Sequence, residues 1–390
     1  MASQQNGRAS VFYDPKIRGI FFQAVLFFAL AAFVWWIADN TIANLRRAHI
    51  ASGFGFLNGR AGFDVSDALI PYSSDSTMAR ALLVGLLNTL LVAVTGIVTA
   101  TIVGFLVGIG RLARNWLVRQ ICTIYIEIFR NIPPLLVIFF WYLGVLSVLP
   151  SPRNSIRLPF DMYLNSRGFY MPAPIWGEGA WLAGAGLLAG VLLAFIVARW
   201  ARQRQMATGR RFPVLWASIA LIVGLPLAAF ALTGFPLSFD VPKASIFNLT
   251  GGIQVKPEFL SLYLALSFYT AAFIAEIVRA GILGVDKGQT EAAYSLGLTP
   301  GPTLRLVIVP QALRIIVPPL TSQYLNLTKN TSLAVAIGYA DLVAIGGTIL
   351  NQTGQAVEIV AIWMVVYLGI SLAVSVLMNW FNARTALKDK

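Results

Sequence analysis

Long apolar runs restrict the fold of this chain more than any other feature of its sequence. About 20 consecutive apolar residues, rising about 1.5 Å each in an α-helix, cross the roughly 30 Å hydrocarbon core of a bilayer. Only 12% of the 390 residues are charged, whereas a soluble domain has roughly a quarter. About eight runs are long enough, near residues 19–38, 81–110, 131–149, 178–198, 213–233, 259–283, 312–330 and 357–380. We therefore expect an all-α, polytopic membrane protein with about eight transmembrane helices.

The first apolar run begins as a signal peptide would, because Lys16 and Arg18 precede it. It is about 20 residues long, ends in Trp35 and Trp36, and has no clean small-residue cleavage site. The apolar part of a signal peptide usually has about 7–15 residues. We interpret this run as an anchor that stays in the protein.

Basic residues gather in short clusters between the apolar runs. The net charge of +13 therefore indicates membrane orientation rather than a nucleic-acid surface, which would have its basic residues along one face. With both termini in the cytoplasm, the inner clusters are Arg8, Lys16 and Arg18, then Arg111, Arg114 and Arg119, then Arg199, Arg202, Arg204, Arg210 and Arg211, then Lys287, Arg305 and Arg314, and finally Arg384, Lys388 and Lys390. The segment 39–80, expected outside, conflicts with this rule by carrying Arg46, Arg47, Arg60 and Arg80.

Two regions depart from a simple alternation of spans and loops. Residues 150–257 combine Pro- and Gly-rich loops with a pair of apolar runs, and we interpret them as an insertion. Further on, two apolar stretches meet at Lys329 and Asn330. We expect the second stretch, 332–347, to be re-entrant or interfacial, since one more full crossing would put the C-terminal basic cluster outside.

The connection between the sixth and seventh runs, residues 284–310, carries several helix-end signals. Thr290 predicts a helix N-cap, Glu291 favours a first turn, and Gly297 can end the helix in a left-handed conformation. Pro300 and Pro302 suit the first turn of a second short helix. These signals predict a helix-turn-helix on the cytoplasmic side, which we call the elbow.

Two further features of the elbow bear on its function. Pro310 is expected to end the second short helix. Ala292 and Ala293 place two small side chains next to Glu291, so that another protein could approach the backbone closely. The alternative is a connector that packs on the bundle and contacts nothing else.

The spacing within the elbow resembles the EAA coupling loop of bacterial ABC importer permeases. The matching residues are Glu291, Ala292, Ala293, Gly297 and Pro310, while Val307 and Val309 replace the Ile and Leu usual in that family. In that family the loop docks on a separate ATP-hydrolysing subunit, so the resemblance implies that these matching residues couple the chain to an ATPase. The chain has no Gly-x-x-x-x-Gly-Lys-Ser/Thr phosphate loop of its own.

Three more motifs resemble the polar amino acid permease branch of this family. They are Glu276, Arg279, Gly281 and Ile282 leading into Gly288 and Gln289, the run Arg-Asn-Ile-Pro-Pro at 130–134, and the run Lys-Asn-Thr-Ser-Leu at 329–333. The resemblance covers about residues 79–383 without the insertion. The added first span and the insertion resemble the larger permease subunit of the general L-amino-acid importer of alpha-proteobacteria.

The resemblance implies a type I ABC importer permease fold and a function in moving amino acids across the bacterial inner membrane. The domains expected are 1–78 as tail, first anchor and periplasmic loop, 79–383 as transmembrane domain with the insertion at about 150–257, and 384–390 as cytoplasmic tail. The implied partners are two ATP-binding subunits, a second homologous permease and a periplasmic amino-acid-binding protein, besides membrane lipid and without nucleic acid. No cofactor is expected in this chain, because ATP and Mg²⁺ would bind to the partner ATPase.

Ionisable and polar side chains at membrane depth are candidates for function, since an unpaired charge there costs several kcal/mol. Glu276 and Arg279 share one helix face and can form a structural ion pair, or one of them can meet the substrate. Lys329 either reaches a membrane interface or lines the same path. Asn88 and Thr89 can bind a zwitterion or bond to a neighbouring helix.

Glycines four residues apart are typical of close helix contacts, and we interpret Gly104 with Gly108, and Gly186 with Gly190, as packing positions. One cysteine (Cys122) and one histidine (His49) exclude a disulfide framework, a Cys/His metal site and histidine-based catalysis. An enzyme is therefore not expected. The main alternative is an ion-coupled secondary amino acid carrier, which would need buried carboxylates as ion sites. A sensor or assembly protein is a third reading.

Overall fold

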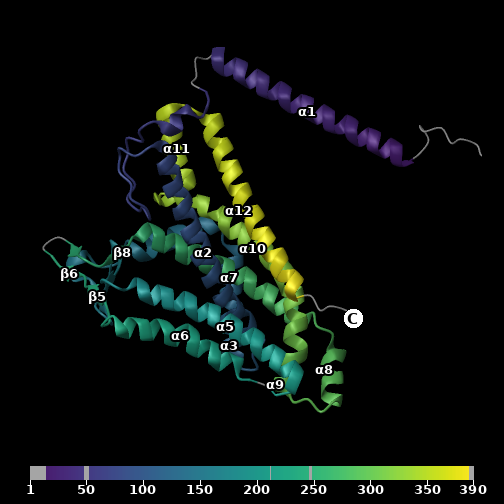
Figure 1. Ribbon diagram of the computed structural model, residues 1–390. Helices are drawn as coiled ribbons and strands as arrows, with labels where there is room; N and C mark the ends of the chain where they lie inside the picture. Colours follow the sequence, from purple (N-terminus) through teal and green to yellow (C-terminus); the bar gives the residue numbers. More distant parts are fainter. Residues whose placement is uncertain (1–14, 48–51, 211, 246–247, 386–390) are drawn as a thin grey trace, which may run out of the picture. The chain divides into compact units, whose positions relative to one another are not determined.

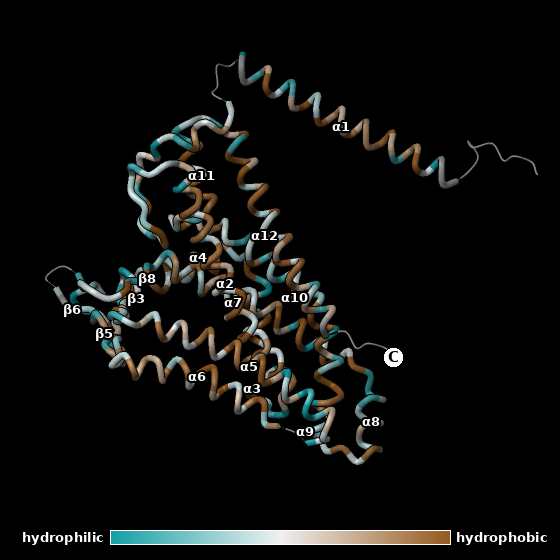
Figure 2. Tube along the Cα trace, in the orientation of Figure 1, coloured by the Kyte–Doolittle hydropathy of each residue, from teal (hydrophilic) through white to brown (hydrophobic). Residues whose placement is uncertain are grey.

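The computed structural model describes residues 15–47, 52–210, 212–245 and 248–385 (Figure 1). Within these ranges, seven helices are long and apolar enough to cross a membrane, and one broken pair could form an eighth span. Figure 2 shows hydrophobic residues along most of their length. The prediction of an all-α membrane protein with about eight spans is confirmed. Arg8, His49, Arg211, Lys388 and Lys390 lie outside the described residues.

The chain forms two compact units, of which the first comprises residues 1–130 and 270–390 and the second residues 131–269. The helices of the first unit are α1 (Pro15–Arg47), α2 (Met78–Gly110), α3 (Trp116–Asn131), α8 (Lys287–Ser295), α9 (Pro300–Thr303), α10 (Val309–Asn330), α11 (Leu342–Thr353) and α12 (Ala356–Thr385). Helix α7 (Pro257–Leu283) begins in the second unit and ends in the first. A short 3₁₀-helix, η2 (Phe54–Asn58), lies between α1 and α2.

The third apolar run, predicted over 131–149, is helical over the shorter range 134–146, and a break separates it from the helix that precedes it. Helix α3 stops at Asn131, and a new helix, α4 (Pro134–Phe139), continues as the π-helix η3 (Phe140–Leu146). The cause is Pro133, which has an extended backbone (φ −58°, ψ 140°) and is followed by a second proline. Proline lacks an N–H and disfavours helix in the residue before it, so the helix breaks here.

The second unit contains the insertion, whose apolar pair forms helices α5 (Trp181–Thr208) and α6 (Val214–Leu232). These pack closely, because a β-carbon at Gly186 or Gly190 would lie 3.0 Å or 2.5 Å from the carbonyl oxygens of Leu225 or Leu221. The prediction that these glycines are packing positions is confirmed.

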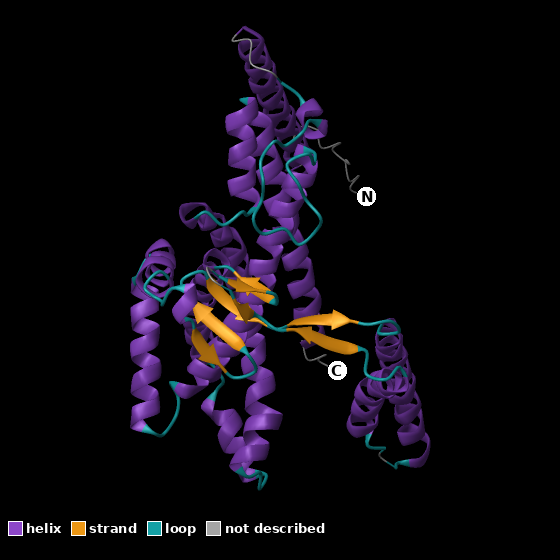
Figure 3. Ribbon diagram, turned by 90° about the vertical axis from the view of Figure 1, so that its left-hand side faces the viewer, coloured by secondary structure: helices purple, strands orange, loops and turns teal. Residues whose placement is uncertain are grey.

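The Pro- and Gly-rich loops of the insertion contain short strands, which sequence analysis did not predict (Figure 3). The strands are β1 (Ile156–Leu158), β2 (Met162–Asn165), β3 (Gly168–Met171), β4 (Ala173–Trp176), β5 (Leu237–Asp240), β6 (Lys243–Ala244), β7 (Leu249–Thr250) and β8 (Ile253–Val255). Antiparallel pairing gives a sheet in the order β1-β2-β3-β8 and two hairpins, β4-β5 and β6-β7. A 3₁₀-turn, η4 (Pro152–Asn154), precedes β1. Backbone pairing between segments far apart in the chain stabilises this sheet.

The region where two apolar stretches meet has a turn inside it. Helix α10 ends at Asn330 and continues as the 3₁₀-helix η6 (Thr331–Ile337). Gly338 then takes a left-handed conformation (φ 76°), and α11 follows with 12 residues, too few to cross a bilayer. The position of 332–347 relative to a membrane stays a prediction.

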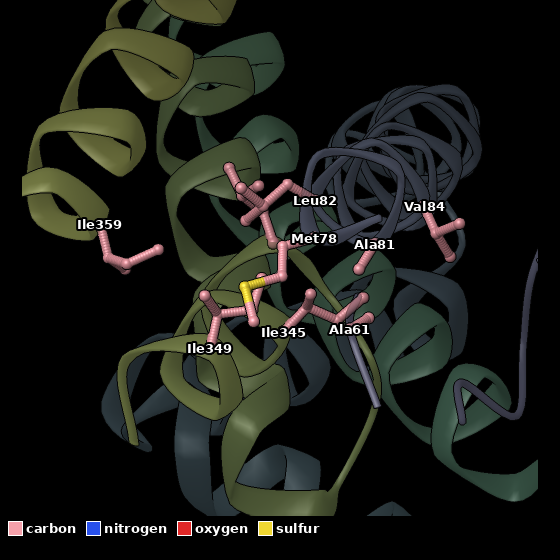
Figure 4. Packing of buried hydrophobic residues seen from close by; sticks show 9 residues of the cluster. Ala61, Met78, Ala81, Leu82, Val84, Ile345, Ile349 and Ile359 are labelled. Atoms are coloured by element: carbon pink, nitrogen blue, oxygen red, sulfur yellow. The ribbon is translucent and has the colours of Figure 1, made fainter. Parts of the chain in front are cut away.

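The core of the first unit lies where α2 meets α11 (Figure 4). Its buried apolar side chains are Ala61, Met78, Ala81, Leu82, Val84, Leu342, Ile345, Ile349 and Ile359. Figure 4 shows Met78 pointing toward Ile345 and Ile349. The segment before α2 therefore packs against α11 through its buried Ala61.

Candidate functional site

The elbow is built as a short helix, a tight turn and a second helical segment. Asp286 caps α8, because its Oδ1 accepts a hydrogen bond from the backbone N–H of Gly288 at 2.6 Å. The predicted N-cap, Thr290, is therefore wrong and lies inside α8. A carboxylate at the N-terminus is a favourable cap because it also interacts with the helix dipole, and this makes Asp286 the natural start.

Gly297 ends α8 as predicted. Its φ is +76°, and the N–H of Leu298 donates to the carbonyl of Ala293 at 3.1 Å. This is the hydrogen-bond pattern of a left-handed helix end, which glycine adopts without a steric penalty. The prediction that Gly297 ends this helix is confirmed.

The second helical segment runs further than expected. Pro300 and Pro302 lie in α9 as predicted, but Pro310 does not end a helix. A π-helical turn, η5 (Leu304–Ile308), joins α9 to α10, and Pro310 lies at the N-terminal end of α10. Proline is tolerated in the first turn of a helix, where its missing N–H would have no intrahelical partner, so the chain continues as a helix through this position.

Exposure within the elbow separates the residues of the Glu-Ala-Ala motif. Glu291 and Ala292 are exposed, whereas Ala293 is buried inside the elbow. A hydrogen bond of 3.1 Å from Gln311 Nε2 to Gln289 Oε1 ties α8 to α10. The elbow is therefore a folded unit that presents the first two motif residues outward.

Large apolar side chains on the elbow are exposed, and sequence reasoning missed them. Leu296 is 82% exposed, and Tyr294, Leu304 and Leu306 are each at least half exposed. Leu296 stands in the turn between α8 and α9, outside the apolar spans. Grouped apolar side chains at a protein surface indicate a contact site for a partner. The signal for Leu296 in the sequence was a leucine in a turn, where polar residues are usual.

An ionic cluster joins the ends of three helices in the first unit. Glu276 of α7 pairs with Arg279 through a contact of 2.6 Å between Oε1 and Nη2, which is one of the two alternatives that the sequence left open. Its Oε2 also accepts a hydrogen bond from Nη1 of Arg111, the C-cap residue of α2. Nη2 of Arg111 lies 3.7 Å from Oε1 of Glu127 on α3. We call Arg111, Glu127, Glu276 and Arg279 the ionic cluster.

Arg111 and Glu127 were not singled out in the sequence for this cluster. Arg111 served there only as a marker of membrane orientation, and its partner is 165 residues away along the chain. The available signal was its place as the first basic residue after a span, where a long side chain can reach a carboxylate on a neighbouring helix.

Asn88 and Thr89 are buried in α2 and hold the turn before α11. Nδ2 of Asn88 donates to the carbonyls of Asp67 at 2.7 Å and Ala340 at 2.9 Å. Oγ1 of Thr89 accepts a hydrogen bond from the backbone N–H of Leu342 at 3.1 Å. Both side chains thus bond to backbone within the protein. Lys329, by contrast, is exposed in the last turn of α10.

Asp341 is a buried carboxyl group that the sequence did not indicate. Its Oδ1 caps α11 by accepting a hydrogen bond from the N–H of Ala344 at 2.8 Å. Oδ2 is buried without a hydrogen-bond partner. Burial raises the pKa of this carboxyl to about 6, although hydrogen bonds from the backbone oppose the shift.

Among the described residues, no three His, Cys, Asp or Glu side chains group in a way that could hold a metal ion. The elbow offers an exposed apolar contact surface, and the ionic cluster joins helices. Neither holds a nucleophile beside a general base.

The chain is similar in sequence to known transport proteins. The family described as "Binding-protein-dependent transport system inner membrane component" matches residues 184–387. The general L-amino acid transport system permease protein AapQ of Rhizobium johnstonii is 66% identical over 98% of this chain and 95% of that protein. The putative amino-acid ABC transporter permease protein YhdX of Escherichia coli is 50% identical over 97% of each. The glutamate/glutamine/aspartate/asparagine transport system permease protein BztB of Rhodobacter capsulatus is 44% identical over 97% of this chain and 96% of that protein.

Proposed function

We propose that this chain, which belongs to the family of inner membrane components of binding-protein-dependent transport systems, is the permease subunit of an ATP-driven importer of amino acids. Three relatives that match nearly the whole chain are named as amino acid permeases. One of these names refers to L-amino acids in general, and another lists four amino acids. A broad range of L-amino acids is therefore the proposed cargo. The same relatives weigh against an ion-coupled secondary carrier.

The observation that carries the proposal in this structure is the exposed apolar surface of the elbow. Leu296, Tyr294, Leu304 and Leu306 are exposed in the same short segment of the chain as the exposed Glu291 and Ala292. A surface of this kind fits a groove on another protein. We infer that the partner is an ATP-binding subunit, present in two copies. This subunit binds ATP and Mg²⁺, so this chain needs no site for them.

The elbow is continuous with two helices of the bundle, which provides a path for movement. Three residues, 284–286, separate the end of α7 from the start of α8, and η5 leads directly into α10. When the ATPases close on ATP, the elbow moves with them and displaces α7 and α10. The bundle then changes between inward-facing and outward-facing states.

The remaining partners follow from the same function. A second homologous permease completes the pathway, and a periplasmic amino-acid-binding protein delivers the substrate to the outer loops. The chain is a multi-pass membrane protein, and we place it in the bacterial inner membrane with both termini in the cytoplasm. Glu291, Ala292, Ala293, Gly297 and Pro310 make up the coupling segment, while Asn88, Thr89 and Lys329 are candidates for the substrate path.

The test is reconstitution of the complex in proteoliposomes with labelled amino acids. Wild-type complex should take up amino acid only with ATP, and uptake that continues on a proton gradient without ATP would contradict the proposal. Leu296→Glu should reduce recovery of the ATPase with this chain by about tenfold or more, because a charge enters an apolar contact.

Leu69→Glu is the matched control, since Leu69 is also an exposed leucine (56%) but lies between η2 and α2, far from the elbow along the chain. Recovery of the ATPase with this variant should equal that of the wild type. Equal recovery with Leu296→Glu as well would exclude the elbow as the contact.

A further inference from the structure

The ionic cluster has one acceptor that is shared between helices. Glu276 receives Arg279 from its own helix and Arg111 from the end of α2. Its side chain is only 23% exposed, whereas that of Glu127 is 55% exposed. Removing the charge of Glu276 would take the acceptor from Arg279 and leave Arg111 with only the looser contact to Glu127, whereas removing Glu127 takes away that looser contact alone.

Next to the cluster, α2 and α7 touch backbone to backbone. A β-carbon at Gly104 would lie 2.6 Å from side-chain atoms of Ile274, and one at Gly108 would lie 2.6 Å from the carbonyl oxygen of Ala275. Helix α2 contributes no side chain to the contact at these positions, so its backbone lies directly against α7. Close packing of this kind transmits displacement, because a packed interior is not easily compressed. Arg111, one turn beyond Gly108, closes the end of this contact.

The same helix α7 leads into the elbow. Glu276 stands two turns before the end of α7 at Leu283, and Asp286 then caps α8. Glu276 therefore lies in the part of α7 that is close to the elbow along the chain, and a displacement of the elbow acts on Glu276 through only two helical turns. From there, Arg111 connects it to α2 and, through its second nitrogen, to α3.

We propose that Arg111 and Glu276 are positioning residues for transport, which pass the displacement of the elbow from α7 to α2 and α3. Glu127 gives Arg111 a second acceptor, so that Arg111 stays paired when α3 moves relative to α7. This inference rests on the proposed function. A pair that only steadied the fold would change the amount of assembled complex and leave the amino acid moved per ATP unaltered.

The experiment uses the complete complex in proteoliposomes and measures amino acid uptake and ATP hydrolysis on the same vesicles. Glu276→Gln and Arg111→Gln should each lower the uptake per ATP by about tenfold while hydrolysis continues, the size of a typical coupling between sites. The double variant should be no worse than either single variant, because the two residues act as one pair. Glu127→Gln should have a smaller effect of the same kind.

Arg119→Gln is the matched control, since Arg119 is an exposed arginine of α3 outside the cluster, and its uptake per ATP should equal that of the wild type. Arg111→Gln leaves Glu276 paired with Arg279, so it decides the question if Glu276→Gln does not assemble. An unchanged ratio in Arg111→Gln, or losses that multiply in the double variant, would overturn the role of the pair. No ATP-dependent uptake by the wild type would instead overturn the proposed function, and this inference with it.

Discussion

Adding one methyl group where α2 meets α7 should destabilise the protein measurably. In Gly108→Ala the new β-carbon would lie 2.6 Å from the carbonyl oxygen of Ala275 and 2.9 Å from Cβ of Val278. Ordinary contacts of carbon begin at about 3.5 Å, so the helices must separate by roughly 1 Å. Overpacking of this kind costs about 1–3 kcal/mol, against which alanine gains up to about 1 kcal/mol as a better helix former.

The assay is thermal denaturation of the purified chain in mild detergent. A net loss of about 1–2 kcal/mol should lower the midpoint by roughly 1–3 °C, because the unfolding entropy of a chain of this length is large. Gly369→Ala is the matched control, because Gly369 lies in the membrane helix α12 and a β-carbon there meets nothing within 4 Å. Its midpoint should stay the same or rise. If Gly108→Ala and Gly369→Ala denature at the same temperature, the close contact of α2 and α7 does not exist.

Substitutions at three further positions test the elbow and the buried polar groups. Gly297→Val should abolish ATP-coupled uptake, because valine at φ +76° costs about 1–2 kcal/mol in the turn, whereas Gly297→Asn should keep most activity in the same transport assay. Asn88→Ala should lower the free energy of unfolding by about 2–4 kcal/mol, since the carbonyls of Asp67 and Ala340 lose their donor, and a midpoint equal to the wild type would count against these bonds. Burial raises the pKa of Asp341 to about 6 in the folded state. Between about pH 4 and 6 the folded protein therefore keeps a proton on Asp341 that the unfolded chain has lost. The free energy of unfolding should fall by about 2–3 kcal/mol as the pH rises through this range. Asp341→Asn keeps the helix cap and should remove this slope in denaturation midpoints measured against pH.

Helix-end signals in the sequence predicted much of the elbow. They failed where two nearby residues could each begin or end the same helix. Gly297 ends α8 because only a residue without a side chain adopts that backbone easily. Thr290 looked like the cap, yet Asp286 four residues earlier caps the helix with a carboxylate. Pro310 looked like a stop, yet the π-helical turn before it lets α10 begin there. Each error concerns a helix boundary, where nearby residues offer alternative ends of similar energy.

The partners of Arg111 illustrate what sequence reasoning could not reach. The pair of Glu276 with Arg279 is three residues apart on one helix, so helical geometry alone predicts it. Arg111 joins the same carboxylate from another helix, and only the close approach of α2 to α7 brings the two together. Asn88 is similar, since its acceptor on Ala340 lies 252 residues away along the chain.

The sequence by itself determined that this protein spans a membrane, where most of its helices run, and the spacing of the coupling motif, because hydropathy and helix-end chemistry act over a few neighbouring residues. Only the tertiary structure decided which charges pair across helices, that the loops of the insertion form strands, and that Asn88 and Thr89 hold the turn before α11. The physical reason is that these contacts join residues far apart in the chain. Their energies depend on how helices and strands pack; glycines four residues apart indicated where helices pack closely, but no local pattern identified the partner of each contact.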